Sequence, residues 1–191
     1  MTTPAPARVL YVIACGAGAA SHVGRLVEQA QQRDWDVRLI ATPAAVEFLD
    51  VSALKPRSGI SSAASTGVPT TAARSLPDAD AIIVAPATYN TINKWAQGIS
   101  DNYALCLLAE AIGLGIPVVV LPFVNAALAA HPAYRRSIAE LRDAGVSVVL
   151  GPGELEPHPP GTGARQLESF PWHLALDRLD LLVSRAGLPG R

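Results

Sequence analysis

Short, almost continuously apolar runs alternate along the chain with longer segments in which apolar residues recur every three or four positions. Runs of the first kind are typical of strands buried on both faces, and the second pattern indicates amphipathic helices. The pattern predicts strands at residues 9–14, 36–41, 81–84, 117–121 and 146–150. It predicts helices at 21–33, 91–111, 132–144 and 172–186, and a shorter one at 44–49.

The alternation of strands with helices predicts the fold class. Right-handed β-α-β crossovers imply a three-layer α/β fold, a doubly wound parallel sheet of the Rossmann-like kind. The 191 residues suit a single domain, 1–191, with a flexible tail at 1–7. Two stretches rich in glycine, proline or small polar residues interrupt the alternation: a surface loop at 55–77 and a flap-like loop at 151–165.

Composition narrows the range of partners. Half of the residues are apolar and only 16% are charged, against the roughly 25% that is typical of soluble domains. Burial of surface in an oligomer would account for so little charge. The net charge of −1 and the lack of a basic cluster argue against nucleic acid. No signal peptide and no apolar run of roughly 18 residues is visible, so we expect no membrane segment and a cytoplasmic protein.

A glycine-rich turn follows the first predicted strand. Its residues Gly16, Ala17, Gly18 and Ala19 lead into a helix, where backbone N–H groups can approach a phosphate. The strict dinucleotide fingerprint needs a third glycine and an acidic residue after the second strand, and the chain has neither. The turn therefore favours a mononucleotide phosphate over a dinucleotide, with a turn of purely structural function as the alternative. No metal-ligand spacing accompanies it, and we expect no metal site.

The segment from Ala85 to Asn102 reads A-P-A-T-Y-N-T-I-N-K-W-A-Q-G-I-S-D-N and follows an apolar strand. Thr88, Asn90 and Thr91 lie at the start of a helix, where short polar side chains cap the helix or hold the polar edge of a planar ligand. The string resembles the P-A-S-x-N-T-I-x-K-x-x-x-G-I-x-D-N motif of the homo-oligomeric flavin-containing cysteine decarboxylases. That family includes phosphopantothenoylcysteine decarboxylase and the peptidyl-cysteine decarboxylases of lantibiotic maturation.

This resemblance covers roughly residues 8–165 and implies a flavoprotein that binds FMN. Members of the family oxidise a C-terminal cysteine thiol to a thioaldehyde on FMN and then release carbon dioxide. By resemblance, the turn from Gly16 to Ala19 and Thr42 hold the FMN phosphate, although Thr42 could instead cap the short helix that follows it. The cofactor contacts that the resemblance implies within the motif are Ala87, Thr88, Asn90 and Thr91.

A second block follows the fourth predicted strand. It resembles the family's P-A-M-N-x-x-M-W-x-x-P block, in which the asparagine holds the substrate carboxylate beside the flavin. Asn125 and Pro132 match this block, whereas Val124 and Leu128 replace its methionines. From the residues alone, an asparagine in an apolar loop needs partners for its amide, either from a ligand or from a local turn. We favour the ligand contact.

The loop at 151–165 ends in Gly161-Thr-Gly-Ala-Arg165, which is similar to the C-G-x-x-G-x-G-R clamp of the pantetheine-processing branch. Arg165 could bind a carboxylate or phosphate with two parallel hydrogen bonds, or it could be solvated. The clamp cysteine has no counterpart, and His158 lies near its place.

One expected residue is missing. The catalytic histidine of the family lies in the loop before the third strand, but residues 71–74 are Thr-Ala-Ala-Arg, and no histidine occurs between His22 and His131. General acid–base catalysis typically contributes about 10²–10⁴-fold. As a replacement we favour His158 or a flap residue of a neighbouring subunit.

These observations predict an FMN-dependent decarboxylase that acts on a C-terminal cysteine or a related thiol-carboxylate, either a small molecule or a peptide. One alternative is a non-catalytic FMN-binding or regulatory subunit. A flavin prenyltransferase is less favoured, because Lys94 lies where the decarboxylases have their lysine. The low charge and the resemblance together predict a homotrimer or a dodecamer of trimers, with the flavin at a subunit boundary.

Overall fold

The computed structural model describes residues 8–49, 63–64 and 76–186 of the chain. These residues contain a six-stranded sheet in which every pairing between neighbouring strands is parallel. The strands are β1 (Arg8–Ala14), β2 (Trp35–Ala41), β3 (Ala63–Ala64), β4 (Ala81–Ala87), β5 (Val118–Pro122) and β6 (Ser147–Val148). Their order is β3-β2-β1-β4-β5-β6, so the direction of winding reverses between β1 and β4.

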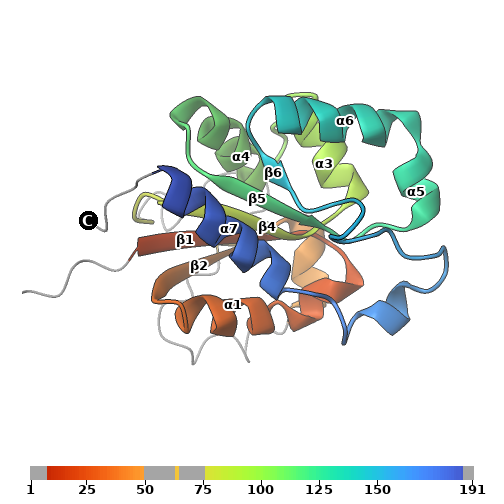
Figure 1. Cartoon of the computed structure of the whole chain (residues 1–191), viewed down its shortest axis with the longest axis horizontal. Coiled ribbons are helices and arrows are strands. Elements are labelled where there is room, and N and C mark those ends of the chain that lie inside the picture. The colour runs from red at the N-terminus through yellow and green to blue at the C-terminus, as the bar shows by residue number, and fades with distance from the viewer. Residues whose placement is uncertain (1–7, 50–62, 65–75, 187–191) are drawn as a thin grey trace, which may run out of the picture.

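Helices cover both faces of the sheet. The α-helices are α1 (Gly24–Gln31), α3 (Tyr89–Ala96), α4 (Tyr103–Leu114), α5 (Ala126–Ala130), α6 (Pro132–Asp143) and α7 (His173–Ala186), and the 3-10 helices are η1 (Gly18–His22), η2 (Pro43–Phe48) and η4 (Gly163–Gln166). Helices α1 and α7 pack on one face, and α3, α4 and α6 pack on the other (Figure 1). The predicted three-layer, doubly wound fold is therefore confirmed.

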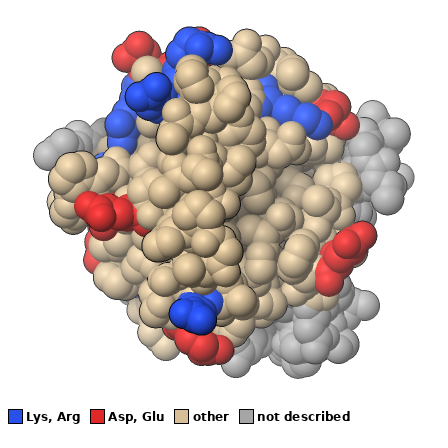
Figure 2. Space-filling view, turned by 90° about the vertical axis from the view of Figure 1, so that its right-hand side faces the viewer, with Lys and Arg blue, Asp and Glu red and all other residues tan. Residues whose placement is uncertain are grey.

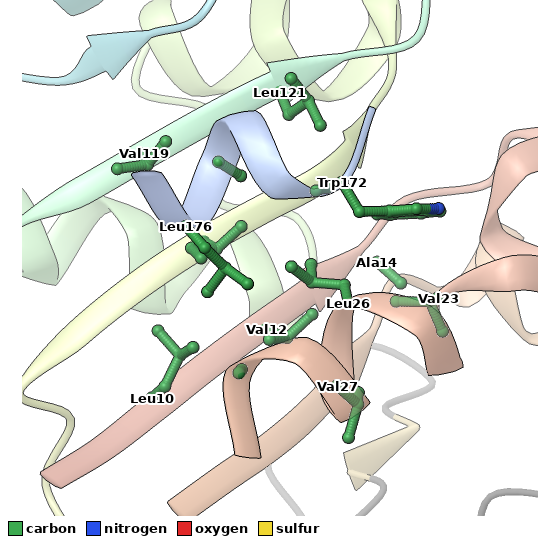
Figure 3. Close-up of a cluster of buried hydrophobic side chains, with 14 of the residues drawn as sticks. Leu10, Val12, Ala14, Val23, Leu26, Val27, Val119, Leu121, Trp172 and Leu176 are labelled. Atoms are coloured by element: carbon green, nitrogen blue, oxygen red, sulfur yellow. The ribbon is translucent and has the colours of Figure 1, made fainter. Parts of the chain in front are cut away.

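Strand β1 shows why the apolar runs are continuous. Leu10 and Val12 point into the core beneath α1 and α7, where Leu26 and Leu176 surround them (Figure 3). The alternate residues Tyr11 and Ile13 point into the second core, beneath α3, α4 and α6. Because successive side chains enter opposite hydrophobic cores, both faces of the strand favour apolar residues.

The predicted helix at 91–111 is wrong, because the structure has two helices there, α3 and α4. Gly98, with φ of 69°, lies in the connecting segment and adopts the left-handed conformation that ends many helices. Asn102 then caps α4, its side-chain oxygen accepting the Leu105 N–H at 3.1 Å. The interruption is hard to see in the sequence because apolar residues continue at helical spacing on both sides of it. It turns the chain back and brings Asp101 to Lys94.

The segment at 151–165 is fastened to the rest of the domain. Glu154 forms an ion pair with Arg178 of α7, and its carboxylate accepts the Leu150 N–H at 2.9 Å. Further along, His158 forms a parallel bridge with Asn125. The segment then passes along the side of the molecule to which the strand ends point (Figure 1).

Several predicted features lie wholly or partly outside the described residues. The predicted tail at 1–7 is one, and most of the predicted loop at 55–77 is another, although its residues 63–64 form β3. None of the helices in the described parts of the chain is both long and apolar enough to cross a bilayer.

Candidate functional site

A cavity of about 330 Å³ lies at the carboxyl ends of β1, β2 and β4. Strands β1 and β2 end level with each other, since Ala14 pairs with Ala41, and β4, whose Val84 pairs with Ile13, continues a little further to Ala87. Ligands of doubly wound sheets bind at this edge, where the winding reverses. The cavity is lined by Gly16, Thr42, Pro43, Ala44, Thr88, Asn90, Thr91, Lys94, Asp101, Asn102 and Leu105.

The turn after β1 reaches the cavity at one residue, Gly16. A Cβ on Gly16 would lie 2.6 Å from the Cβ of Ala44 and 2.8 Å from its carbonyl carbon, so only glycine allows the turns after β1 and β2 to approach this closely. The predicted neighbours Ala17, Gly18 and Ala19 continue into η1 and do not line the cavity. Their predicted contact with a phosphate stays a prediction.

Thr42, after β2, presents a buried hydroxyl without a partner. The residue is only 5% exposed, and its Oγ1 has no hydrogen-bond partner among the described residues. Thr42 occupies the N-cap position of η2, yet its side chain makes no capping bond. Leaving a hydroxyl buried and unpaired costs about 1–3 kcal/mol. The alternative in which Thr42 serves as a helix cap is therefore not supported, and the hydroxyl is available to a ligand in the cavity.

The turn after β4 combines capping with cavity lining. Thr88 caps α3, its Oγ1 accepting the Thr91 N–H at 3.3 Å while its hydroxyl donates to Thr91 Oγ1 at 3.0 Å. Asn90, in the first turn of α3, is exposed and lines the cavity. Ala87 is fully buried and does not line it. Both interpretations of the motif, helix cap and ligand surface, are thus compatible with the same three polar side chains.

Two charged residues that line the cavity, Lys94 and Asp101, belong to the motif but were not predicted as site residues. Lys94 of α3 forms an ion pair with Asp101, and Asn102 Nδ2 also donates to Asp101 at 3.1 Å. The hydrogen bond from Lys94 lowers the pKa of Asp101, which is therefore ionised at neutral pH. Their recurrence in the motif K-x-x-x-G-I-x-D-N was the signal that could have identified them.

Cys15 lies directly before the cavity turn. Its side chain is fully buried, and burial raises the pKa of the thiol despite hydrogen bonds with Thr91 and Thr88 that act in the opposite direction. A thiol with a raised pKa is protonated at neutral pH and is a poor nucleophile. Cys15 therefore packs in the core beside the cavity turn and is not suited to act as a nucleophile.

The second group of predicted residues lies after β5. Asn125 caps α5, its Oδ1 accepting the Leu128 N–H at 3.0 Å, so the local turn that competed with a ligand contact is formed. Its amide nitrogen has no hydrogen-bond partner within the described parts of the chain, and it could still donate to a ligand. The backbone of His158 lies beside it, since the Ala126 N–H donates to the His158 carbonyl at 2.8 Å.

The His158 ring lies in apolar surroundings. Its centroid is 4.9 Å from that of Phe123, and its Nε2 would be 3.2 Å from a Cβ placed on Gly163. Burial lowers the pKa of His158, so the ring is neutral at pH 7 and able to accept a proton. His158 lines a second cavity of about 40 Å³, together with Phe123, Val124, Phe170 and others. Neither Asn125 nor His158 lines the larger cavity.

The other candidate residues and histidines lie away from the larger cavity or outside the described residues. Arg165 is exposed, and its guanidinium has no partner among the described residues. His22 pairs with Glu168 at 2.9 Å, and His131 Nδ1 accepts the Ala133 N–H at 3.1 Å as the cap of α6. Residues 71–74, where the family histidine was expected, lie outside the described residues. Within the described chain, no cluster of three or more His, Cys, Asp or Glu side chains is arranged to hold a metal ion.

Known proteins resemble this chain in sequence. A family model described as Flavoprotein matches residues 2–166. Phosphopantothenoylcysteine decarboxylase of Arabidopsis thaliana is 29% identical over 156 residues, which cover 78% of this chain and 73% of the relative. Cysteine/cysteine sulfinic acid decarboxylase from an unknown prokaryotic organism is 38% identical over 77 residues, covering 40% of this chain but only 21% of the relative. Coenzyme A biosynthesis bifunctional protein CoaBC of Bacillus subtilis is 44% identical over 63 residues, which cover 33% of this chain and 15% of the relative.

Solved structures share the fold. A cysteine-to-serine mutant of PPC decarboxylase, complexed with pantothenoylaminoethenethiol, superposes with a TM-score of 0.63 at 20% identity, covering 86% of this chain and 96% of the other. The epidermin biosynthesis protein EpiD from Staphylococcus aureus has a TM-score of 0.63 at 25% identity, covering 74% of this chain and 81% of the other. The family predicted from the sequence motif is therefore confirmed.

Proposed function

Starting from the fact that this chain belongs to the flavoprotein family, we propose that it binds FMN and catalyses the oxidative decarboxylation of a C-terminal cysteine or a related thiol-carboxylate. Solved relatives include the FMN binding protein AtHal3 and the FMN-dependent cysteine decarboxylase SpaF. In this chain, the proposal uses the residues that line the larger cavity together with Asn125 and His158, all of which lie near the carboxyl ends of the strands.

The observation that carries the cofactor proposal is the buried, unpartnered hydroxyl of Thr42 beside a cavity lined by both polar and apolar groups. A phosphate oxygen accepting a hydrogen bond from this hydroxyl would offset the cost of burying it. The adjacent turn at Gly16 and the beginning of α3 supply backbone and side-chain donors on the same cavity. No acidic residue follows β2 to hold a dinucleotide ribose, so the mononucleotide FMN fits better than FAD or NAD.

The substrate proposal rests on Asn125. Its Oδ1 is occupied by the helix cap, which fixes the orientation of the amide and leaves the nitrogen as a donor for a carboxylate. When bound, FMN supplies the two-electron oxidation of the thiol-bearing carbon. The backbone of His158 is bridged to that of Asn125, and burial lowers the pKa of the His158 ring, so that it is neutral at pH 7.

A second function is favoured by a specific observation, the lack of any histidine between His22 and His131. A chain without the family base would keep its fold and cofactor cavity and serve as a non-catalytic FMN-binding or regulatory subunit. A flavin prenyltransferase is a weaker alternative, because Lys94 occupies the decarboxylase position in the motif.

We further propose a homotrimer or a dodecamer. Figure 2 shows the side of the molecule to which the strand ends point, where Lys, Arg, Asp and Glu lie mostly around the rim and the centre is largely uncharged. Large apolar side chains on η2 and α5 are also partly exposed: Val46 by 39%, Phe48 by 40% and Leu128 by 40%. Association of copies through this side would bury them.

The test begins with the absorbance spectrum of the purified chain and the mass of its released cofactor. FMN in stoichiometric amount is expected, whereas stoichiometric FAD or a nicotinamide nucleotide would refute the cofactor proposal. Anaerobic mixing with cysteine-ended peptides then separates the two functions: a decarboxylase bleaches its flavin and releases carbon dioxide, and a non-catalytic subunit does neither. Light scattering that finds a stable flavin-bound monomer at micromolar concentration would refute the assembly.

A further inference from the structure

We propose that Lys94 is a direct ligand of the phosphate of the bound mononucleotide, and that Asp101 competes with this phosphate for the Lys94 ammonium. The inference rests on the proposed function and deepens it, because it assigns recognition of the phosphate charge to a residue of α3, outside the turns after β1 and β2. Both side chains line the cavity that also contains Thr42.

The cavity is built to favour an anion. It lies at the amino-terminal ends of two helices, α3 with eight residues and α4 with twelve, whose first N–H groups carry partial positive charge. Among the residues that the structure describes, Lys94 is the one cationic side chain that lines it. Asp101, just before the cap residue of α4, supplies the opposing negative charge.

Thr42 points independently to a ligand in the same cavity. The residue is 95% buried and lines the cavity, and its hydroxyl has no partner among the described residues. A phosphate offers several acceptor oxygens, so one oxygen can accept from Thr42 while another accepts from Lys94. A neutral ligand would leave the Lys94 charge without a new partner.

Lys94 is free to exchange partners. The side chains of the Lys94–Asp101 pair are 32% and 47% exposed, and ion pairs that are exposed to this extent contribute little to stability. Lysine has a flexible stem and three rotatable donors, so its ammonium can leave Asp101 without movement of the helix. A phosphate carrying up to two negative charges then attracts Lys94 more strongly than the single carboxylate does.

The experiment compares FMN with riboflavin, which lacks the phosphate, by fluorescence titration of the full chain after removal of bound flavin. Lys94→Gln should weaken FMN binding by about 10–100-fold, the usual effect of losing a charge-assisted hydrogen bond, and should change riboflavin binding less than about 2-fold. Lys94→Arg should retain most of the FMN affinity.

Asp101→Asn should tighten FMN binding while lowering thermal stability slightly, because α4 loses a favourable charge near its start. Arg8→Gln, which removes one positive charge at the opposite edge of the sheet, is the matched control and should alter neither titration.

Two results would overturn the inference alone: FMN binding that Lys94→Gln leaves unchanged, or equal weakening of FMN and riboflavin, which would mean that Lys94 only supports the fold. Inorganic phosphate separates this failure from failure of the proposed function. If the wild-type chain binds phosphate in a Lys94-dependent manner but does not bind FMN, the anion site stands and the proposed cofactor is wrong.

Discussion

The two groups of site residues differ in how far the protein itself satisfies their polar atoms. In the cavity at the ends of β1, β2 and β4, the Thr42 hydroxyl is buried and unpaired, and a Lys–Asp pair is half-solvated. After β5, the Asn125 oxygen caps a helix and His158 packs against Phe123. The first region has polar groups that a ligand can satisfy, whereas the second is arranged largely by its own contacts. On the proposed function, a ligand is needed to satisfy the polar groups of the first region, whereas the second region is ordered without one.

The sharpest test of the second region is Asn125→Asp. Aspartate caps helices as well as asparagine does, so α5 should still form. Its charge would repel a substrate carboxylate at about 4 Å by about 4 kcal/mol at a near-surface dielectric, a loss of roughly 10³-fold in binding. Titration with a carboxylate ligand measures this, and flavin content should remain normal. Unchanged affinity for every carboxylate ligand would remove Asn125 from the site.

In the first region, Gly16→Ala should be the most damaging change. The new Cβ would meet the Ala44 backbone at 2.8 Å, and a backbone contact cannot rotate away. We expect a loss of about 1–3 kcal/mol in the free energy of unfolding, together with loss of bound flavin. Gly18→Ala is the control: its Cβ would meet only the end of the Leu167 side chain at 3.2 Å, so unfolding should change by less than about 0.5 kcal/mol. Equal effects of the two variants would contradict the close-approach argument.

Thr42→Val tests whether the unpaired hydroxyl serves a ligand. Valine has nearly the same shape, so the flavin-free protein should be as stable as the wild type or more stable by up to about 1 kcal/mol. FMN affinity should nevertheless fall by about 10-fold, because a hydrogen bond to a charged group is lost. Thr88→Val makes the contrast, since it removes the α3 cap and should destabilise the free protein by about 1 kcal/mol. A Thr42→Val protein that is less stable but binds FMN normally would show that the hydroxyl stabilises the fold and does not bind the ligand.

The smallest expected effect concerns pH and His158. Burial lowers the pKa of His158 below its ordinary value of 6.5. As the pH falls, His158 is therefore protonated in the unfolded chain before it is protonated in the folded chain. The resulting stabilisation is fully present above about pH 6.5 and is lost as the pH falls through the folded pKa. Urea unfolding at pH 7 and pH 5 should therefore differ less for His158→Gln than for the wild type. An imidazole that titrates at or above 6.5 by NMR would show that the ring is not held neutral.

Much of this protein could be predicted from the sequence alone, because the relevant signals are local. Continuous apolar runs such as 9–14 and 81–84 indicate strands buried on both faces, and their alternation with helices predicts the doubly wound sheet. The motif from Ala85 to Asn102 was sufficient to identify the family. Gly16 was found in the glycine-rich turn after the first strand, and Thr42 was found through the family resemblance, which places a threonine after the second strand.

Which of these residues share a cavity, and which polar atoms remain unpaired, depends on the packing of the fold and is seen in the structure alone. The break between α3 and α4 returns Asp101 to Lys94, although the apolar pattern runs through it. The contact between Asn125 and His158 joins two loops that are far apart in sequence. Whether Thr42 caps η2 depends on the geometry of one turn, and the residue type is suited to either outcome. Periodicity and propensity describe neighbours along the chain, whereas hydrogen-bond satisfaction depends on which distant groups the packed fold brings together.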